Sequence, residues 1–342
     1  MRLALCAGLF LFSLCPMFAQ RQELEQCILF YNCENLFDPS DNPDKADDDF
    51  TPRGPMHWTG FRQYAKMLNL SKAIMGADGM RAPALVGLAE VENDSVMQRL
   101  TKGTPLWKYE YEYLITDGPD ARGINVALMY QPIDFRLLGW SQIEIPLPQG
   151  NRPTRPLLHA WGGIWGGDTL DVVVCHLPSR RGGAKRSDQN RHIARRKIIS
   201  LYDSLYHCRK SLHFIVMGDM NDYPNSRSLQ EDLSSSVPAI VNLMEPLQRE
   251  LKNGRRPYGS HKYDGEWGFL DQFWVNGEIV RTEADSIPGV WVNDVDVVCF
   301  PFMLVEDETH LGHRPFRSYY GQKYEGGFSD HLPVRMKLHI RL

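Results

Sequence analysis

The stretch Leu212-His213-Phe214-Ile215-Val216-Met217-Gly218-Asp219-Met220-Asn221-Asp222 changes from mostly apolar to polar in its middle. The first half predicts a buried β-strand, and Asp219 and Asn221 follow where that strand breaks. Further along, Ser329-Asp330-His331 stands directly before another apolar run. Both stretches therefore place carboxylates, an amide or an imidazole at the end of a strand, where a rigid backbone holds them in the way that acid–base catalysis needs.

Short apolar runs bounded by turn residues recur along the chain. We predict strands at residues 28–31, 84–91, 111–116, 124–130, 170–176, 212–217, 269–275 and 295–302. Several of these runs are continuous rather than alternating, which is typical of strands that are covered on both faces.

Two segments show apolar residues at helical spacing. Residues 61–77 carry Phe61, Tyr64, Leu68 and Met75, and residues 187–206 begin at a serine N-cap and carry Ala194, Ile198, Leu201 and Leu205 on one face. We see no internal repeat and no long linker. Many strands with helices between them predict a layered α/β sandwich.

The first residues predict an exported protein. The positive start Met1-Arg2 is followed by an apolar run to Phe12, and Ala19 precedes Gln20, which is typical of a signal peptide cleaved after residue 19. The alternative, a transmembrane anchor, needs about 20 apolar residues, and this run is shorter. We therefore expect residues 20–342 to form one domain of a secreted or periplasmic monomer without a membrane span. No stable protein partner is implied.

Charge and cysteine content narrow the class further. The formal net charge is −4, so no global basic field indicates nucleic acid. Outside the signal, the cysteines are Cys27, Cys33, Cys175, Cys208 and Cys299. Their odd number and irregular spacing do not fit a disulfide framework. Cys27, Cys33, Cys175 and Cys299 lie in or beside apolar runs, so we expect buried thiols there, with one disulfide as the alternative. The acidic residues 38–49 are interpreted as a solvated loop, with calcium binding as the alternative.

Polar side chains occupy the ends of the predicted strands or interrupt them. They are Asn32, Glu34, Glu90, His176, Asp219, Asn221, Asp271, Asp330 and His331. Glu90 and Asp271 stand out because burying an unpaired carboxylate in an apolar strand costs on the order of several kcal/mol. Each residue alone could make a structural hydrogen bond, but so many in one chain indicate a site.

The chemistry of this set favours a hard metal ion. Carboxylate and amide oxygens suit Mg²⁺, Mn²⁺ or Ca²⁺, and the sequence has no His-x-x-x-His or paired-cysteine spacing for zinc. Asp271 and His331 could form a carboxylate–imidazole pair. A hard metal beside acid–base groups is what phosphoester hydrolysis requires.

The order of these motifs and the residues within them resemble those of one known family. The motifs are Tyr31-Asn32-Cys33-Glu34-Asn35-Leu36, Ala89-Glu90-Val91, Cys175-His176-Leu177, Gly218-Asp219-Met220-Asn221, Leu270-Asp271 and Ser329-Asp330-His331-Leu332-Pro333. Together, from about residue 27 to 340, they resemble the endonuclease/exonuclease/phosphatase superfamily. The resemblance implies a deoxyribonuclease I-like fold, a four-layer α/β sandwich in which two mostly antiparallel sheets are flanked by helices.

The resemblance also implies a metal set. Asn32 and Glu34 would lie near metal and phosphate, Glu90 would be the main metal ligand, and Asp330 would be a second metal or histidine-orienting carboxylate. The family usually has glutamine before the metal-binding glutamate, whereas this chain has Ala89.

The catalytic roles are carried over in the same way. His176 would donate to a phosphate oxygen, Asp219 would orient or deprotonate water, Asn221 would hold phosphate, and Asp271 would pair with His331. Glu92 is a lower-ranked alternative to Glu90.

The substrate is less defined by the sequence. Basic residues crowd the segment after His176, and we expect Arg180, Arg181 and Arg186, with Arg122, to bind substrate phosphate. The alternative for the basic segment is a solvated helix face. Trp267 and Tyr263 could stack a base, although a packing role is favoured for each.

Three functions remain open at this point. The first is a secreted or periplasmic endonuclease or phosphodiesterase dependent on Mg²⁺ or Mn²⁺, with Ca²⁺ as a further candidate. The second is a phosphatase or a phospholipase C-type hydrolase that acts on a phospho-lipid or phospho-sugar head group. The third, a catalytically inactive binding protein, is disfavoured by the intact metal and acid–base set. The Gly268-Phe269-Leu270-Asp271-Gln272 spelling weakens the inositol-phosphatase alternative.

Overall fold

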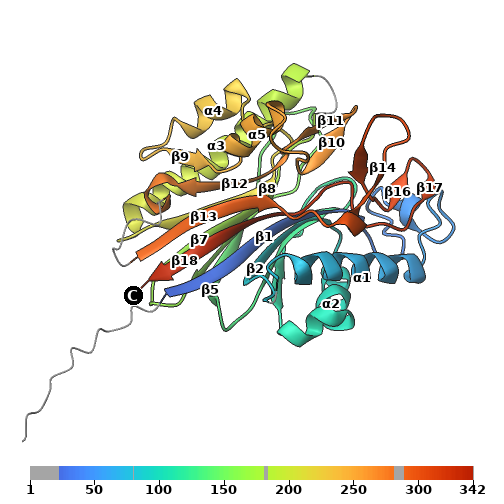
Figure 1. The fold of residues 1–342 in the computed structure, drawn as a ribbon, viewed down its shortest axis with the longest axis horizontal. Helices are drawn as coiled ribbons and strands as arrows, with labels where there is room; N and C mark the ends of the chain where they lie inside the picture. The colour runs from blue at the N-terminus through green and yellow to red at the C-terminus, as the bar shows by residue number, and fades with distance from the viewer. Residues whose placement is uncertain (1–22, 80, 181–183, 281–288, 342) are drawn as a thin grey trace, which may run out of the picture.

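Two six-stranded β-sheets face each other in this protein (Figure 1). The structure, a computed structural model, describes residues 23–79, 81–180, 184–280 and 289–341. The first sheet has the order β13-β18-β1-β2-β4-β3, and the second has the order β5-β6-β7-β8-β12-β9. Within each sheet, the strand pairing is antiparallel except for one central parallel pair, β1/β2 in the first and β7/β8 in the second.

The strands of the first sheet are β1 (Glu23–Leu36), β2 (Leu85–Val91), β3 (Glu112–Ile115), β4 (Asn125–Tyr130), β13 (Gly289–Val297) and β18 (Val334–Arg341). Those of the second are β5 (Arg136–Ile143), β6 (Leu157–Gly163), β7 (Thr169–His176), β8 (His213–Asp219), β9 (Ile240–Asn242) and β12 (Asp271–Asn276). Three hairpins complete the described strands: β10 (His261–Tyr263) with β11 (Glu266–Gly268), β14 (Leu304–Glu306) with β15 (His313–Pro315), and β16 (Tyr319–Tyr320) with β17 (Lys323–Tyr324).

Helices cover the outer faces of both sheets. They are α1 (Gly60–Gly76), α2 (Asp94–Gly103), α3 (Ala184–Cys208) and α4 (Arg227–Leu233). Helix α5 (Glu245–Lys252) instead packs Leu247 and Leu251 against the cluster between the sheets. Figure 1 shows α1 and α2 on one side of the paired sheets and α3 and α4 on the other. This arrangement of helix, sheet, sheet and helix confirms the four-layer α/β sandwich.

The central core lies between the two sheets. Phe30 of β1 and Met336 of β18 belong to the same buried cluster as Met217 of β8 and Phe273 of β12. The apolar runs that predicted strands are continuous because their other faces also pack, against the helices. Val216, for example, joins the cluster formed with α3. Burial on both faces fixes the register of the central strands and thereby the position of the residues at their ends.

The structure corrects three details of the sequence interpretation. The strand expected at residues 295–302 instead covers Gly289–Val297, and a 3₁₀ turn follows at Pro301–Met303, because proline cannot donate to a strand ladder. Helix α3 begins before Ser187, which lies inside it rather than at its N-cap. Helix α1 buries Met67, Leu70 and Ile74, while Phe61 is 80% exposed; the buried face has the same helical spacing as the predicted one.

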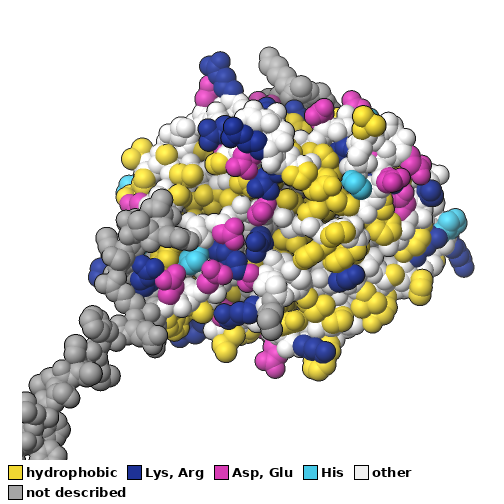
Figure 2. All heavy atoms as spheres, viewed as in Figure 1, with side chains coloured by type: hydrophobic (Ala, Val, Ile, Leu, Met, Phe, Trp, Pro, Cys, Tyr) yellow, Lys and Arg dark blue, Asp and Glu magenta, His cyan; other side chains and the backbone are white. Residues whose placement is uncertain are grey.

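The cysteines and the surface charges are those of an ordinary globular protein. The five cysteines of the described residues are all free; Cys27, Cys33 and Cys175 are buried as predicted, whereas Cys299 is only partly buried and Cys208 is exposed. Figure 2 shows acidic and basic side chains interspersed on the face in view, which fits the small net charge.

Across the described residues, every helix is too short or too polar to span a membrane. The signal peptide predicted at residues 1–19 lies outside the described part of the chain.

Candidate active site

The central strands of both sheets bring predicted site residues to one edge. Asp219, the last residue of β8, is in register with His176 at the end of parallel β7 and with Asp271 at the start of antiparallel β12. In the other sheet, His331 precedes β18, which runs antiparallel to β1. Parallel strands end, and antiparallel strands begin, at the same sheet edge. The fold therefore explains why residues far apart in sequence meet here.

Irregularities in the strand pairing turn the side chains of Asn32 and Glu90 toward this edge. The pairing of β1 with β2 shifts register after Asn32, and the pairing of β2 with β4 shifts at Glu90. Glu90 has a φ of 59°, and Asn35 has a φ of 51°, values that are uncommon for residues other than glycine. Bulges next to active sites re-aim side chains, and this one takes Glu90 out of the alternation of an otherwise buried strand.

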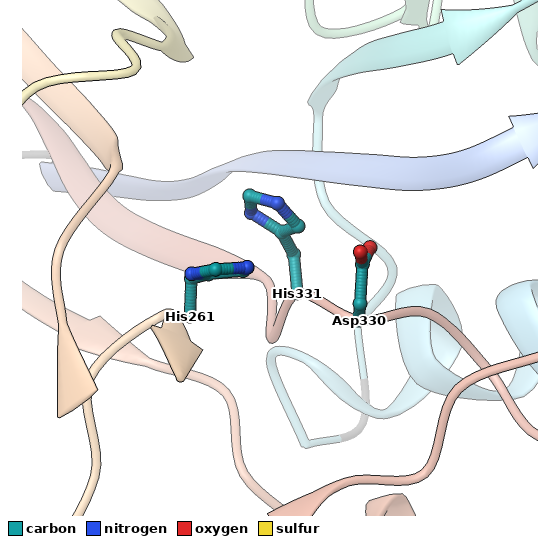
Figure 3. A group of neighbouring side chains, drawn as sticks. All are labelled: His261, Asp330 and His331. Atoms are coloured by element: carbon teal, nitrogen blue, oxygen red, sulfur yellow. The ribbon is translucent and has the colours of Figure 1, made fainter. Parts of the chain in front are cut away.

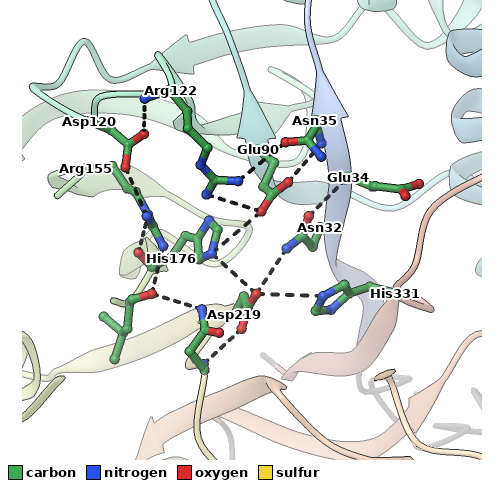
Figure 4. Close-up of polar contacts among 12 residues, drawn as sticks. Asn32, Glu34, Asn35, Glu90, Asp120, Arg122, Arg155, His176, Asp219 and His331 are labelled. Atoms are coloured by element: carbon green, nitrogen blue, oxygen red, sulfur yellow. Dashed lines mark hydrogen bonds and ion pairs between the residues drawn. The ribbon is translucent and has the colours of Figure 1, made fainter. Parts of the chain in front are cut away.

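Asp219 is the centre of the resulting polar cluster (Figure 4). Its Oδ2 accepts a hydrogen bond from Asn32 Nδ2 at 3.0 Å, and its Oδ1 accepts one from the backbone N–H of Asn221 at 2.9 Å. Two imidazoles approach the same Oδ2, His176 at 3.5 Å and His331 at 3.9 Å. Burial is the main cause that raises the pKa of Asp219, to about 7. Asp219 is thus a carboxylate that can take up or release a proton near neutral pH.

Asp271 and His331 form a close buried pair. His331 Nδ1 lies 2.7 Å from Asp271 Oδ2, and the other oxygen of Asp271 has no hydrogen-bond partner among the described residues. Burial alone would lower the pKa of His331, but Asp271, together with Asp330 and Asp219, raises it to about 10. The pair therefore keeps His331 protonated at neutral pH, with Nε2 toward Asp219 (Figure 4).

Glu90 and His176 lie on the opposite side of Asp219 from His331 (Figure 4). His176 Nε2 is 4.0 Å from Glu90 Oε1, and the backbone N–H of Asn35 donates to Glu90 Oε2 at 2.9 Å. Burial, reinforced by the charges of Arg155 and Arg122, holds the pKa of His176 well below its usual value. The His176 imidazole is therefore neutral. It does not offset the negative charge of the Glu90 and Asp219 carboxylates that lie beside it.

A cleft of about 1300 Å³ opens over this cluster. Its lining includes Glu90, His176, Asp219, Asn221, Asp330 and His331. The predicted phosphate-binding residues Arg122, Arg180 and Arg186 also line it, whereas Arg181 lies outside the described residues. Arg180 packs over the ring of Tyr223 at 5.2 Å, and Tyr263 is exposed at the rim. The cleft thus combines an oxygen-rich floor with cationic and aromatic walls.

Two residues expected at the metal site have other partners. Glu34 accepts hydrogen bonds from Arg317 Nε at 3.0 Å and from the backbone N–H of Ser318 at 2.8 Å, and Lys66 Nζ lies 3.5 Å away. Its side chain turns away from Asp219 (Figure 4). Asp330 lines the cleft, but its Oδ2 accepts a hydrogen bond from Arg317 at 3.0 Å. The structure therefore does not bring Glu34 to the cluster.

The basic segment after His176 divides in the structure. Arg191 and Arg195 are buried, and Arg195 pairs with Asp232 and Asp222. These two arginines therefore fasten α3 to its neighbours and are neither a solvated face nor substrate ligands. Arg186 differs, because it is exposed at the cleft, where it donates to Asn151 and to the Gly150 carbonyl.

Several residues of the site escaped sequence reasoning. Arg155 donates to the carbonyls of His176 at 2.7 Å and Leu177 at 2.8 Å and to Asp120 at 3.1 Å, which fixes the end of β7. His261 lies against His331 with ring centroids 4.6 Å apart. A lone arginine or histidine in a polar segment gives no signal in one sequence, since its partners are set by the fold.

The chain belongs to the endonuclease/exonuclease/phosphatase family, whose model matches residues 27–340. The resemblance inferred from the motifs is thereby confirmed, and the protein is a hydrolase of that kind. No curated protein sequence matches this chain.

Solved structures show the same fold. An endonuclease/exonuclease/phosphatase family protein from Bacteroides thetaiotaomicron is 16% identical, with a TM-score of 0.57 over 94% of this chain and 97% of that one. The human nocturnin catalytic domain with a bound sulfate anion is 15% identical, with a TM-score of 0.55 over 93% and 97%. TDP2 from D. rerio, in complex with a single-strand DNA product, is 16% identical, with a TM-score of 0.53 over 92% and 98%.

Proposed function

We propose that this protein is a metal-dependent phosphodiesterase, most concretely a nuclease, that works at the Asp219-centred cluster. The observation that carries the proposal is the convergence of Asn32, His176 and His331 on one buried carboxylate at the floor of an open cleft. Such a set can position water, move a proton and offset charge on a phosphoryl group.

The donors around Asp219 fit a hard divalent cation. Glu90 and Asp219 supply carboxylate oxygens on either side of the neutral His176 imidazole. Asn32 holds Asp219 through its amide Nδ2, while its Oδ1 accepts a hydrogen bond from the Glu34 N–H. Mg²⁺ prefers such oxygens, Mn²⁺ accepts them, and Ca²⁺ is a further candidate. We propose that Glu90 is the main ligand, and that Glu34 and Asp330 are held by Arg317 instead. When bound, the cation would offset the negative charge of the phosphate.

We assign the proton chemistry to Asp219 and the Asp271–His331 pair. Asp219 accepts the proton of the attacking water, because burial places its pKa near neutrality. Asp271 fixes the orientation of His331 through Nδ1, so that Nε2 is available to a phosphoryl oxygen in the cleft.

The remaining polar residues hold the substrate in this proposal. His176 lines the cleft with its Nε2 3.5 Å from Asp219, and as a neutral imidazole it can donate one hydrogen bond from this nitrogen to phosphate. Asn221 donates to the Leu177 carbonyl at 3.0 Å, which orients its amide at the cleft wall.

Two features favour a nucleic acid as substrate. Arg122, Arg180 and Arg186 line a cleft that is far larger than one phosphate needs, and Tyr223 and Tyr263 line the same cleft. Cationic grooves with stacking rings are typical of proteins that bind single strands. The single-strand DNA product in the TDP2 complex, a protein of the same fold, agrees with this choice.

Binding of a single-stranded DNA oligonucleotide in EDTA should depend on salt. Each phosphate contact contributes a log–log slope of about −0.7 for a single strand. Arg180→Ala and Arg186→Ala should therefore each flatten the slope, measured by fluorescence anisotropy, by somewhat less than one unit. Arg196→Ala is the matched control, because Arg196 is exposed on the same basic segment but bonds Ser235 outside the cleft. A slope that no cleft variant changes would remove these arginines from the proposal.

A hydrolysis panel with added Mg²⁺, Mn²⁺ or Ca²⁺ tests the substrate class. It compares single-stranded DNA, RNA, plasmid DNA, bis-p-nitrophenyl phosphate, p-nitrophenyl phosphate and sphingomyelin. We expect cleavage of the nucleic acids and of the diester. Turnover of only the monoester or only sphingomyelin would replace the nuclease proposal with a phosphatase or a phospholipase C-type hydrolase.

We propose further that the protein is exported as a monomer after cleavage behind Ala19. The support is the apolar N-terminal run and the small residue at position 19. The intact mass of the protein recovered outside the cytoplasm would show whether it begins at Gln20.

A further inference from the structure

We propose that His261, Asp330 and His331 form a second cation site, suited to Zn²⁺, and that Zn²⁺ bound there inhibits the enzyme. Figure 3 shows these three side chains as neighbours on two adjacent segments. One donor atom from each lies within 4.8 Å of the donors of the other two. No zinc-ligand spacing is visible in the sequence because the fold assembles the site from β10 and from the segment before β18.

The backbone holds the two histidines together. His261 and His331 form an isolated antiparallel bridge, and the N–H of Leu332 donates to the carbonyl of Ser260 at 2.7 Å. The rings lie at 42° to each other with centroids 4.6 Å apart. Because the backbone pairing holds the two residues together, rotation of the side chains alone would let both imidazoles bind one cation.

The third donor comes from Asp330. Its Oδ2 accepts the Arg317 hydrogen bond, so the carboxylate is held beside the histidines while Oδ1 can serve as a ligand. On His331, Nδ1 is taken by Asp271, so a cation would bind at Nε2 and displace the proton of that nitrogen to solvent. All three residues line the same cleft, which gives the cation access from solvent.

The donor types decide which cation is favoured. Two imidazoles and one carboxylate suit Zn²⁺ and similar transition metals, which commonly use three protein ligands and leave one position open. Mg²⁺ prefers oxygen donors and keeps its water shell. This site is therefore distinct in chemistry from the proposed Mg²⁺ site at Glu90, and the two ions should not compete strongly for it.

The inhibitory effect rests on the proposed function. A cation on Nε2 of His331 would remove the group that faces the phosphate, while Glu90 and Asp219 would keep their contacts with Asn35 and Asn32. Zn²⁺ should therefore lower turnover in the presence of saturating Mg²⁺.

Zn²⁺ titration by calorimetry in excess Mg²⁺, with Co²⁺ absorption as a second readout, tests binding directly. His261→Asn should weaken Zn²⁺ more than the roughly 100-fold that loss of an outer partner of a ligand can cost, and should abolish the visible Co²⁺ band. Asp330→Asn should also weaken it, which keeps the test decisive if one variant fails to fold. His207→Asn, which removes an exposed histidine on α3, is the matched control and should leave the isotherm unchanged.

The outcomes separate this site from the hydrolase proposal. Tight Zn²⁺ binding that is lost in His261→Asn supports the site even if no phosphoester is hydrolysed, in which case only the inhibitory role fails. Binding that survives His261→Asn but is lost in Asp219→Asn would assign Zn²⁺ to the neighbouring group of Asp219, Asp271 and His331 and overturn the proposal. Loss of binding in His207→Asn alone would mean a surface site and would also overturn it.

Discussion

Replacing Asp271 with asparagine is expected to lower kcat/KM for phosphodiester hydrolysis by a factor of about 10²–10⁴. The buried carboxylate raises the pKa of His331 and directs its Nε2 at the cleft. Asparagine keeps the shape but removes the charge. His331→Ala should cause a loss of similar size, and the double variant should lose little more, because the two residues act as a unit.

A second buried pair provides the control for this experiment. His159 Nε2 lies 3.0 Å from Asp171 Oδ1 in the same sheet, but neither residue lines the cleft. Asp171→Asn should lower the melting temperature while leaving kcat/KM of the folded enzyme almost unchanged. Losses at Asp271 and His331 that multiply in the double variant would contradict the pairing, and so would equal losses at Asp171.

Asp219→Asn is expected to have the other large effect, near the upper end of the range of about 10²–10⁴ for a lost acid–base group. Asp219 is the only carboxylate of the described residues within 4.0 Å of both His176 and His331, so its loss would remove the proton acceptor that we propose. Steady-state kinetics in saturating Mg²⁺ measure this effect.

Asp222, three residues beyond Asp219 at the end of β8, gives a matched comparison. It is also buried, but it bonds Arg195 and Ser226 at 3.4 and 2.9 Å and does not line the cleft. Asp222→Asn should therefore reduce stability and leave turnover within a few-fold of wild type. If both variants lose turnover equally, the effect of Asp219 is structural rather than catalytic.

The layers and the cluster were predictable where the sequence carries strong local signals. Continuous apolar runs marked the central strands, and their burial on both faces bears this out. Glu90 and Asp271 were recognisable because a carboxylate in an apolar strand needs a partner. Edge strand β5 was not, since its exposure changes from residue to residue and Gly139 interrupts it.

The errors have a common physical cause, which is that partners from distant segments cannot be seen in one sequence. Glu34 follows a strand end as the other site residues do, yet Lys66 and Arg317 neutralise it. From the sequence, Arg195 belongs to a basic segment that could be a solvated surface. The fold instead places Asp222 and Asp232 beside it. His261 could not be predicted as a site residue, because only the fold places it beside His331.

The central claim is that the Asp219-centred cluster hydrolyses phosphodiesters with a divalent cation held by Glu90. The most direct test follows bis-p-nitrophenyl phosphate hydrolysis during a Mg²⁺ titration of the chelated enzyme, for wild type, Glu90→Gln and Glu92→Gln. Glu92 is the control, since it is buried nearby but accepts a hydrogen bond from the Asp38 N–H at 2.6 Å outside the cleft. We predict no activity in EDTA, full recovery with Mg²⁺ for wild type and Glu92→Gln, and a midpoint raised by more than about tenfold for Glu90→Gln. Full activity in EDTA, or an unchanged midpoint in Glu90→Gln, would contradict the account.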